Sequence, residues 1–467
     1  MNPVLAVTSA SLLLALAPRA QSLGCHDLGG IAPIATELFL AAPLQGSSSM
    51  RVTQQGVVLF EQPFGTATLN DVMPIASATK TLSAAVLMSL VDANLLSLDD
   101  HVGQYLPEWN TGLKALVTLR MCFTHTSGIQ PNDPAVNNQA LTLRQAAQQL
   151  AGQPLRFLPG NKFEYGGGGM HVAGAVCEVV ANQAWDQLFA QRIALPLGMT
   201  ATDYAGFGPT TNPMIAGGAR STLRDYARFV EMLRLRGTVN GVQVLSTASV
   251  DTMLTAQTVG LPIVGTPHPY SAPYGIGIWI DHRDAQGRTT FASGVGAFGF
   301  AGWIDRNHDA SGVYAIHYLN QISYPYLERM WQEIDAAVLP PGATCLGAPT
   351  PACAPGVWLN GDRTVVSGAS EFTLRVDRAP ASSIGAMLLG DPLNGGLPVF
   401  DLSAFLGPQI DVIAGLVSDA NGRATLAASL LGVPAASIFG LQSVWLSPAP
   451  CTAMGLQASH GLRLDVQ

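Results

Sequence analysis

Charged residues are scarce in this chain of 467 residues, and lysine is the scarcest of them. Asp, Glu, Lys and Arg make up 12% of the sequence, and 23 Lys and Arg against 31 Asp and Glu give a formal net charge of −8. No run of basic residues occurs, so the electrostatic signature of a nucleic-acid-binding protein is missing. Because hydrophobic residues make up 48% of the chain, charge-driven disorder is also excluded. We expect a packed protein of about two to three domains that does not bind nucleic acid.

Metal-ligand spacings are missing as well, because neither Cys-x-x-Cys nor His-x-x-x-His occurs. The sequence therefore indicates no metal and no cofactor. In an oxidising compartment the three C-terminal cysteines can pair with one another or with Cys25, and the sequence does not choose among these pairings. Cys122 and Cys177 lie in apolar stretches and are expected to be small core residues. The six cysteines are Cys25, Cys122, Cys177, Cys345, Cys353 and Cys451.

The N-terminal apolar run over 4–16 is too short for the roughly 20 residues of a membrane span. Ala20 and Ser22 follow it at the two positions that a signal peptidase reads. We therefore expect a signal peptide over 1–22, a secreted or periplasmic protein and no transmembrane span. A lipid anchor at Cys25 is the less favoured alternative, because Leu23 is misplaced by one residue for a lipoprotein processing site.

A segment rich in proline and glycine, over 339–356, cannot continue a helix or a strand. We place a Pro-rich linker at 341–356, between one domain over 28–340 and a second over 357–467. After this linker, short β-type runs alternate with turn residues, which predicts an antiparallel β-sandwich of about 110 residues. The runs are 371–376, 384–389, 411–417, 424–430, 443–446 and 462–466.

The first domain mixes both periodicities, with strand patterns near its ends and helix patterns between them. This order predicts an α/β domain in which N- and C-terminal strands form one antiparallel sheet flanked by helices, with a helical region inserted between them. The expected helices are 81–90, 143–150, 171–180, 223–235 and 327–338, and the expected strands are 57–60, 274–280, 300–304 and 312–319.

Lysine occurs only as Lys80, Lys114 and Lys162, and only Lys80 lies on an apolar helical pattern. Ser77 precedes it by three residues and so shares its helix face. Pro74 suits the start of this helix, which places Ser77 where free backbone N–H groups favour a developing oxyanion. A lysine buried beside a serine has a lowered pKa, as a proton acceptor for a nucleophile requires. The alternative is an ordinary surface lysine at the start of a helix.

Further short motifs follow this tetrad along the chain. Together with it they resemble the serine β-lactamase and penicillin-binding-protein superfamily, in particular its branch of class C β-lactamases, DD-peptidases and β-lactamase-like esterases. The resemblance covers roughly residues 30–340. The motifs are 75–80 (Ile-Ala-Ser-Ala-Thr-Lys), 123–128 (Phe-Thr-His-Thr-Ser-Gly), 158–160 (Leu-Pro-Gly), 163–165 (Phe-Glu-Tyr), 196–199 (Pro-Leu-Gly-Met), 216–219 (Ala-Gly-Gly-Ala), 274–277 (Tyr-Gly-Ile-Gly) and 296–299 (Gly-Ala-Phe-Gly).

The resemblance implies a β-lactamase/transpeptidase-like fold for the first domain and the chemistry of a serine hydrolase without a cofactor. It implies that Ser77 is the nucleophile, Lys80 its activator and Tyr165 the general base and acid. Gly296 and Ala297 would lie on the substrate-facing strand, with an oxyanion-binding N–H at Ala297. The alternative for Tyr165 is a packed aromatic residue with a satisfied hydroxyl.

Two departures from the family pattern bear on the substrate. The Tyr-x-Asn motif becomes Tyr165-Gly166-Gly167, which lacks the amide that contacts a substrate's acylamino group. No lysine follows Lys162, so the Lys-Thr-Gly element is missing, and the corresponding segment 294–297 reads Gly-Val-Gly-Ala. A substrate carboxylate therefore has no fixed cation. A neutral ester or amide fits this site better.

Two other residues need a choice between roles. Arg288 is the nearest cation upstream of segment 294–297, and we interpret it as an exposed turn residue after Gly287. His125 lies in the motif Thr-His-Thr-Ser-Gly, which resembles a structural turn of the family. We therefore interpret His125 as a hydrogen-bonded scaffold residue rather than as a general base.

The favoured function is a secreted serine hydrolase that acts through a Ser77 acyl-enzyme on neutral carboxylic esters. Within enzymes, the alternative is a D-amino-acid-specific peptidase or a weak β-lactamase. An alternative of another class is a catalytically silent cell-surface binding protein on the same fold. The expected partners are a small ester or amide substrate and a cell-surface ligand of the C-terminal domain.

Overall fold

The structure is a computed structural model, which describes residues 28–267, 273–346, 357–362, 365–367, 369, 372–399, 402–430, 433–446 and 456–467. The expected signal peptide, Cys25, Cys353 and Cys451 lie outside the described residues. Within the described ranges, no helix is both long enough and apolar enough to cross a bilayer.

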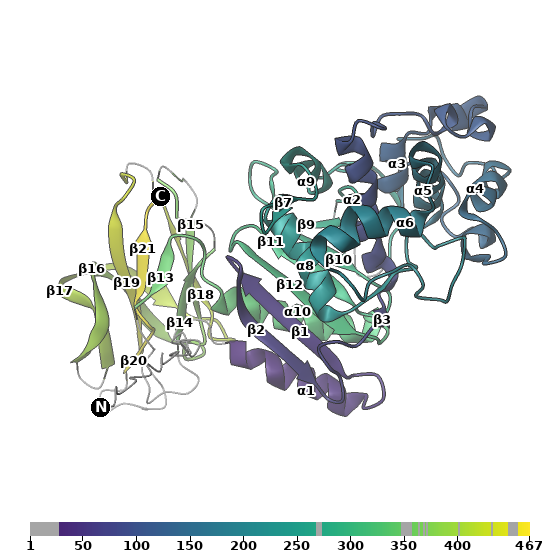
Figure 1. The fold of residues 1–467 in the computed structure, drawn as a ribbon. Coiled ribbons are helices and arrows are strands. Elements are labelled where there is room, and N and C mark those ends of the chain that lie inside the picture. Colours follow the sequence, from purple (N-terminus) through teal and green to yellow (C-terminus); the bar gives the residue numbers. More distant parts are fainter. Residues whose placement is uncertain are drawn as a thin grey trace, which may run out of the picture.

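A six-stranded antiparallel sheet forms the centre of the first domain, in the order β2-β1-β12-β11-β10-β9 (Figure 1). Strand β1 pairs with β12 from Ser48 opposite Ile316 to Gln54 opposite Ala310. Strands from the two ends of the domain therefore meet in one sheet, as the sequence predicts. The strands are β1 (Ser48–Gln54), β2 (Val57–Phe64), β9 (Trp279–Arg283), β10 (Thr289–Val295), β11 (Ala301–Asp305) and β12 (Ala310–Ile316).

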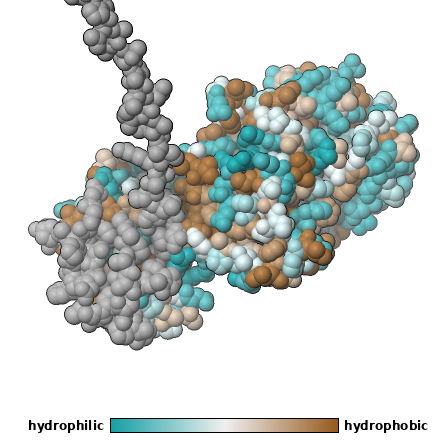
Figure 2. Space-filling view, turned by 60° about the horizontal axis from the view of Figure 1, so that its bottom comes forward, coloured by the Kyte–Doolittle hydropathy of each residue, from teal (hydrophilic) through white to brown (hydrophobic). Residues whose placement is uncertain are grey.

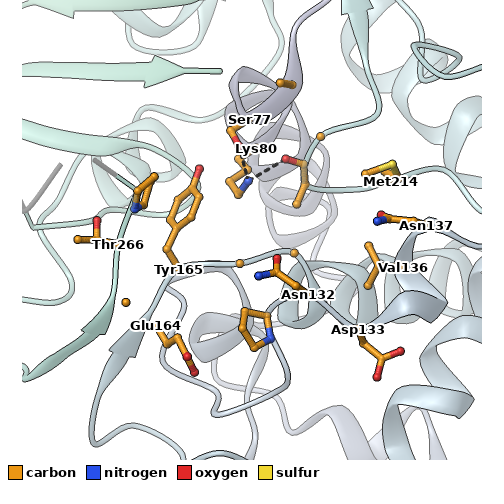
Figure 3. A pocket seen from close by; sticks show the side chains of 18 of the residues that line it. Ser77, Lys80, Asn132, Asp133, Val136, Asn137, Glu164, Tyr165, Met214 and Thr266 are labelled. Carbon is orange, nitrogen blue, oxygen red and sulfur yellow. Dashed lines mark hydrogen bonds between the residues drawn. The ribbon is translucent and has the colours of Figure 1, made fainter. Parts of the chain in front are cut away.

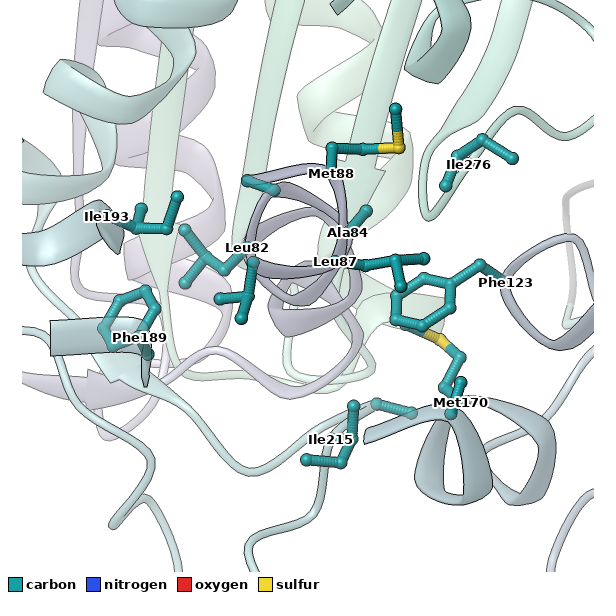
Figure 4. Packing of buried hydrophobic residues seen from close by; sticks show 14 of the residues in the cluster. Leu82, Ala84, Leu87, Met88, Phe123, Met170, Phe189, Ile193, Ile215 and Ile276 are labelled. Atoms are coloured by element: carbon teal, nitrogen blue, oxygen red, sulfur yellow. The ribbon is translucent and has the colours of Figure 1, made fainter. Parts of the chain in front are cut away.

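Helices cover both faces of this sheet. Helices α1 (Ile31–Ala41) and α10 (Asn320–Ala337) pack on one face and on each other. Helices α2 (Thr79–Asp92) and α8 (Leu223–Arg234) pack on the other. Figure 4 shows Leu82, Leu87 and Met88 of α2 among apolar side chains of the helical region. Because α2 is buried along almost its whole length, it is a rigid support for the residues at its N-terminus.

The helical region lies between β2 and β9 in the chain, as predicted. Its helix α4 begins at a capping box, in which Thr142 accepts from the Gln145 N–H and the Gln145 side chain bonds back to Thr142. Cys122 and Cys177 are free, fully buried core residues of this region, as expected. Its helices are α3 (Leu119–Phe123), α4 (Leu143–Ala151), α5 (Gly168–Ala181), α6 (Trp185–Phe189), α7 (Leu195–Leu197) and α9 (Thr247–Met253).

Short strand pairs fix the loops of this region. Strand β3 pairs with β5, and β6 pairs with β7. Strand β4, which ends just before Tyr165, pairs in parallel with β8. The bounds are β3 (Met73–Pro74), β4 (Phe163–Glu164), β5 (Arg220–Ser221), β6 (Thr238–Val239), β7 (Val242–Gln243) and β8 (Ile263–Gly265).

The strand expected over 274–280 is wrong for most of its length, because β9 begins only at Trp279. The Gly275 N–H donates to the Ile278 carbonyl, which closes a turn. Gly277 has a φ of +73°, and a Cβ atom there would lie 2.6 Å from the Lys80 carbonyl oxygen. This apolar segment therefore runs over α2 as a turn, since its glycines allow a close backbone approach that a strand pattern alone does not reveal.

The C-terminal region is all-β, as predicted, with two antiparallel sheets around one core. One sheet has the order β13-β21-β19-β16-β17 with β20 beside β19, and the other has the order β14-β15-β18. Trp445 is fully buried in their shared core. The strands are β13 (Ala343–Cys345), β14 (Trp358–Gly361), β15 (Phe372–Asp377), β16 (Ile384–Val399), β17 (Leu402–Val417), β18 (Ala424–Ala428), β19 (Ile438–Leu446), β20 (Leu456–Ala458) and β21 (Leu462–Asp465).

Strand β13 lies inside the segment 341–356 that the sequence predicts to be a linker. It pairs with β21, and the Asp465 N–H donates to the carbonyl of Gly342. The chain therefore joins the C-terminal sheet within a few residues of Pro340. The buried Asn360 of β14 donates to the carbonyls of Asp335, Ala336 and Val338 at the end of α10, so the two regions share hydrogen bonds.

Candidate active site

Ser77 and Lys80 lie at the N-terminal end of α2. Ser77 is the middle residue of a 3₁₀ turn over Ala76–Ala78 that leads directly into the helix. The Lys80 ammonium nitrogen Nζ lies 2.9 Å from Ser77 Oγ and 2.8 Å from the Ala216 carbonyl oxygen (Figure 3). The residue before Ser77, Ala76, has a φ of +44°, a strained conformation of the kind that surrounding structure holds at functional sites.

Lys80 is almost completely buried, with 4% of its surface exposed. Burial lowers its pKa from 10.5 to about 7, because desolvation disfavours the charged amine. Its two hydrogen-bond partners are neutral oxygens, and no ion pair of Lys80 occurs among the described residues. Near neutral pH the charged and neutral forms of this amine are therefore close in free energy.

Tyr165 follows β4 and faces the same pair. Its backbone N–H donates to the Gly265 carbonyl, and its ring stacks on Trp279 with centroids 5.2 Å apart. Lys80 Nζ lies 4.5 Å from the centre of the ring, and in Figure 3 the phenol group points toward Ser77 and Lys80. Burial raises the pKa of Tyr165, and a hydrogen bond with Ser77 acts in the opposite direction. The hydroxyl is therefore neutral at ordinary pH and able to donate.

His125 supports Tyr165 from behind. It is buried with a φ of +59°, its ring lies 4.6 Å from the Tyr165 ring, and its carbonyl accepts from the Glu164 N–H. Burial and the nearby Lys80 charge lower the pKa of His125 well below its usual value. The residues that line the cleft do not include it. His125 therefore packs behind Tyr165, but its buried Nε2 has no hydrogen-bond partner among the described residues. The hydrogen-bonded scaffold role stays a prediction.

Gly296 and Ala297 follow β10 and lie against the turn that carries Ser77. A Cβ atom at Gly296 would stand 2.2 Å from the Ile75 carbonyl oxygen and 3.3 Å from the Ala76 Cβ. The Ala297 carbonyl accepts from the Asn320 N–H, whereas no backbone acceptor within the described ranges takes the N–H of Ala297 itself. Ala297 does not line the cleft, but the next residue, Phe298, does.

A cleft of about 530 Å³ opens over Ser77, Lys80 and Tyr165 (Figure 3). Lys80 is the single cation among its described lining residues, and Arg288, exposed and paired with Asp284 at 2.6 Å, is not one of them. The structure thus places Arg288 in a turn, as expected. The other lining residues are Ala76, Pro131, Asn132, Asp133, Val136, Asn137, Glu164, Gly166, Gly167, Phe207, Met214, Ala216, Gly217, Gly265, Thr266, Pro267 and Phe298.

Sequence reasoning missed the wall over 131–137 and the apolar residues Phe207 and Met214. No motif marks these positions, because they meet the cleft only through tertiary packing. A signal was nevertheless present in the four consecutive glycines 166–169, since a glycine run often marks the close approach of another backbone segment.

One group of residues has the composition of a metal site, formed by Asp305, His308 and Asp335, whose ligand atoms lie within 4.8 Å of one another. It lies outside the cleft. His308 Nδ1 lies 2.6 Å from Asp305, and Arg375 pairs with Asp335. Because a guanidinium already neutralises Asp335, this group is an ion-pair network that joins the end of β11, α10 and β15 of the C-terminal region.

Comparison with known proteins places this geometry in a family. The Beta-lactamase family profile matches residues 44–337. Protein Rv1367c of Mycobacterium tuberculosis is 28% identical over 288 residues, which cover 49% of this chain and 71% of that protein.

Solved structures give the same fold. A candidate beta-lactamase from Bacteroides dorei DSM 17855 superimposes with a TM-score of 0.60 at 28% identity, over 66% of this chain and 99% of its own. A family VIII carboxylesterase superimposes with a TM-score of 0.53 at 17% identity, over 66% of this chain and 98% of its own. The chain therefore belongs to the Beta-lactamase family of serine hydrolases.

Proposed function

We propose that this protein hydrolyses neutral carboxylic esters through an acyl-enzyme on Ser77. The observation that carries the proposal is the 2.9 Å contact between Ser77 Oγ and the buried Lys80 Nζ. With a pKa of about 7, Lys80 is largely a neutral amine at slightly alkaline pH, and its lone pair accepts the proton that Ser77 loses on attack.

Acylation begins when Ser77 Oγ attacks the ester carbonyl carbon and its proton moves to Lys80. The backbone N–H groups of Ser77 and Ala297 hold the oxyanion that forms on the carbonyl oxygen. Tyr165 protonates the leaving alkoxide as the carbon–oxygen bond breaks and regains a proton from Lys80. A water molecule then attacks the acyl carbon and gives one proton to the neutral Lys80 amine, by way of the Tyr165 hydroxyl. This proton passes from Lys80 to Ser77 Oγ as the bond between Oγ and the acyl carbon breaks, and the carboxylic acid leaves.

The charge of the cleft supports an uncharged substrate. Lys80 is the single cation among the described lining residues, and its pKa favours the neutral form above about pH 7. Asp133 and Glu164 also line the cleft, Glu164 in a salt bridge with Arg156. A substrate carboxylate would lose its hydration without gaining a permanent positive partner. The shared fold with a carboxylesterase agrees with ester hydrolysis.

The alternative activity, that of a D-amino-acid-specific peptidase or a weak β-lactamase, needs a cation that holds the substrate carboxylate. A catalytically silent binding protein is the alternative of another class. Retention of a buried, unpaired lysine argues against this second alternative, because such a lysine destabilises the fold and is useful chiefly for proton transfer.

The experiment compares purified wild type with Ser77→Ala on a short p-nitrophenyl ester and on a chromogenic cephalosporin. We expect ester turnover by the wild type, loss of at least 10³-fold in Ser77→Ala, and no turnover of the cephalosporin. Preferred turnover of the cephalosporin would establish the β-lactamase alternative, and a folded wild type inactive on both substrates would contradict the esterase.

We further propose that the protein is secreted, with a signal peptide over 1–22, a hydrolase domain over 28–340 and an accessory β domain over 357–467, to whose sheet β13 adds a strand from the expected linker. Cys345 is disulfide-bonded, which is typical of oxidising compartments. Mass spectrometry of the protein recovered outside the cytoplasm tests this proposal. We expect the mass of residues 23–467, and the mass of the uncleaved chain would contradict cleavage after Ser22.

A further inference from the structure

The turn over 274–278 touches the helix that carries Lys80. The Thr81 hydroxyl of α2 donates to the Gly277 carbonyl at 3.0 Å. A Cβ atom at Gly277 would stand 2.6 Å from the Lys80 carbonyl oxygen, so the two backbones are in direct contact. The middle of this turn is therefore fixed to α2 beside the residue that is proposed to accept the proton.

The same turn is part of the core of the catalytic region. Ile276 belongs to the apolar cluster that also contains Met88 and Phe123 (Figure 4), and its N–H donates to the Met253 carbonyl at 3.0 Å. Hydrophobic residues also lie scattered over the surface that Figure 2 shows, but Ile276 is fully buried. Changes in this turn therefore act inside the molecule and not at its surface.

The end of the turn contacts the other residue of the proposed proton transfer. Trp279, the first residue of β9, stacks on the Tyr165 ring with centroids 5.2 Å apart and planes inclined by 18°. Trp279 is 2% exposed, and the Tyr274 ring meets it edge-on at 4.8 Å. Trp279 is not one of the described residues that line the cleft. Its influence on a substrate therefore passes through Tyr165.

The direction of the Tyr165 side chain depends on these ring contacts. Four glycines follow it, at 166–169, so the residues after Tyr165 offer no side chain that could pack against the phenol. The rings of His125 and Tyr274 also contact it, but they are inclined to it by 52° and 80°. The near-parallel ring of Trp279 is therefore the flat surface that sets the plane of the phenol.

We propose that Trp279 is a positioning residue of the active site, which holds the Tyr165 hydroxyl where it can exchange a proton with Lys80. Lys80 Nζ lies 4.5 Å from the centre of the Tyr165 ring. Because Thr81 and Gly277 fix the turn to α2, one element of the core places both residues of the proton transfer. The inference rests on the esterase function proposed above and concerns the step in which the leaving group is protonated.

Two esters with one acyl group and different leaving groups test this role. As the carbon–oxygen bond of the ester breaks, the leaving oxygen takes the Tyr165 proton, which Lys80 replaces. Ethyl butanoate releases a strongly basic alkoxide that depends on this proton, whereas p-nitrophenyl butanoate releases a weakly basic phenolate that does not. The measured quantity is kcat/KM, because it covers the steps from free enzyme and ester through acylation.

We expect Trp279→Leu to lower kcat/KM for ethyl butanoate by about 10²-fold, as for the loss of a general acid, and to leave the p-nitrophenyl ester within about three-fold. Trp279→Phe keeps a ring for stacking and should restore the ratio of the two values to within about three-fold of the wild type. Trp303→Leu is the matched control, because it changes a buried tryptophan of the same sheet that packs on Trp331. It should leave the ratio unchanged.

Thr81→Val tests the other end of the turn, and it decides the question if Trp279→Leu does not fold. It removes the hydroxyl that donates to the Gly277 carbonyl and keeps the shape of the side chain. Thr81 is not one of the described residues that line the cleft. We expect the ratio of the two esters to shift in the same direction by about three- to ten-fold, as for one lost hydrogen bond.

An equal fall for both esters in Trp279→Leu, or no fall for either, would overturn the inference and leave the proposed function in place. An unchanged ratio in Thr81→Val would do the same where Trp279→Leu does not fold. A wild type that cleaves only the p-nitrophenyl ester would also overturn the inference, because the enzyme would then protonate no basic leaving group. A wild type that cleaves neither ester would overturn the proposed function and the inference with it.

Discussion

Gly296 lies so close to Ile75 that a Cβ atom on the glycine would stand 2.2 Å from the Ile75 carbonyl oxygen. The same glycine donates its N–H to the Phe300 carbonyl at 2.8 Å, so it is fixed on the sheet side as well. The end of β10 and the turn before Ser77 are therefore held at backbone contact. In the proposed mechanism, this contact positions the Ala297 N–H relative to Ser77.

Gly296→Ala should therefore damage catalysis more than folding. The added methyl group must separate β10 from the Ser77 turn, at a cost of about 1–3 kcal/mol. We expect kcat for a p-nitrophenyl ester to fall by at least 10²-fold, because one misplaced oxyanion donor has an effect of this size. Gly415→Ala, at a site with open space around the glycine, is the matched control. Equal activity of the two variants would contradict the role of this contact.

Tyr165→Phe removes one hydroxyl and leaves the ring that stacks on Trp279. Because this hydroxyl is proposed to pass the proton to the leaving group, we expect kcat to fall by about 10²- to 10⁴-fold with little change in KM. The matched control is Tyr314→Phe, which deletes a buried hydroxyl of β12 outside the cleft. If Tyr165→Phe retains more than a tenth of the wild-type kcat, Tyr165 is a packing residue.

The pH dependence of the reaction follows from Lys80. Burial lowers its pKa from 10.5 to about 7, and the neutral amine is the form that accepts the Ser77 proton. We expect kcat/KM to rise with pH through about 7 and to reach a plateau above it. Rates of p-nitrophenyl ester cleavage between pH 5 and pH 9, corrected for spontaneous hydrolysis, measure this midpoint. A rate that still rises at pH 9 without reaching a plateau would contradict a depressed lysine pKa.

The same shift predicts that stability, like activity, rises with pH, but over a higher pH range. Between about pH 7 and 10.5 the unfolded chain binds a proton at Lys80 that the folded chain releases, so stability rises with pH across this window. Below about pH 7 the full penalty of burying the charge remains. Lys80→Met removes this penalty and should raise the free energy of unfolding by a few kcal/mol at pH 7. The loss of the two hydrogen bonds of Lys80 Nζ reduces this gain.

Denaturant unfolding of wild type and Lys80→Met at pH 7 and at pH 10 measures this effect. The advantage of the variant should shrink at pH 10, while its esterase activity is lost at both values. Lys114→Met, which changes a half-buried lysine outside the cleft, is the control. An advantage that does not change with pH would show that the gain comes from apolar packing and not from the lysine charge.

The parts of the site that the sequence predicts are those built from local spacing. Ser77 and Lys80 meet because residues three apart share a helix face, and β1 and β12 meet because strand patterns frame a helical region. Asn132 was not predicted, because its place depends on a backbone approach across 35 residues to Gly167. The turn over 274–278 was missed for a related reason, since Gly277 touches Lys80 almost 200 residues earlier in the chain.

One side chain of the C-terminal region, that of Asn360, binds the end of α10. Asn360 is 2% exposed and donates to the Asp335, Ala336 and Val338 carbonyls, at 3.1, 3.2 and 2.9 Å. It therefore satisfies the free carbonyls at the C-terminus of α10 from outside the helix. Asn360→Ala leaves these carbonyls buried without this donor, which should cost about 1–3 kcal/mol.

Calorimetry of the full chain measures this cost. Because α10 packs on the sheet of the catalytic region, we expect the unfolding temperature of that region to fall in Asn360→Ala, and the unfolding of the C-terminal sheets to separate from it. Asn421→Ala, in an exposed turn before β18, should leave the transition unchanged. A single transition at the wild-type temperature in Asn360→Ala would contradict this role of Asn360, because the helix end would then need no donor from the C-terminal sheets. The two regions would in that case be coupled through other contacts, such as the Arg375–Asp335 pair.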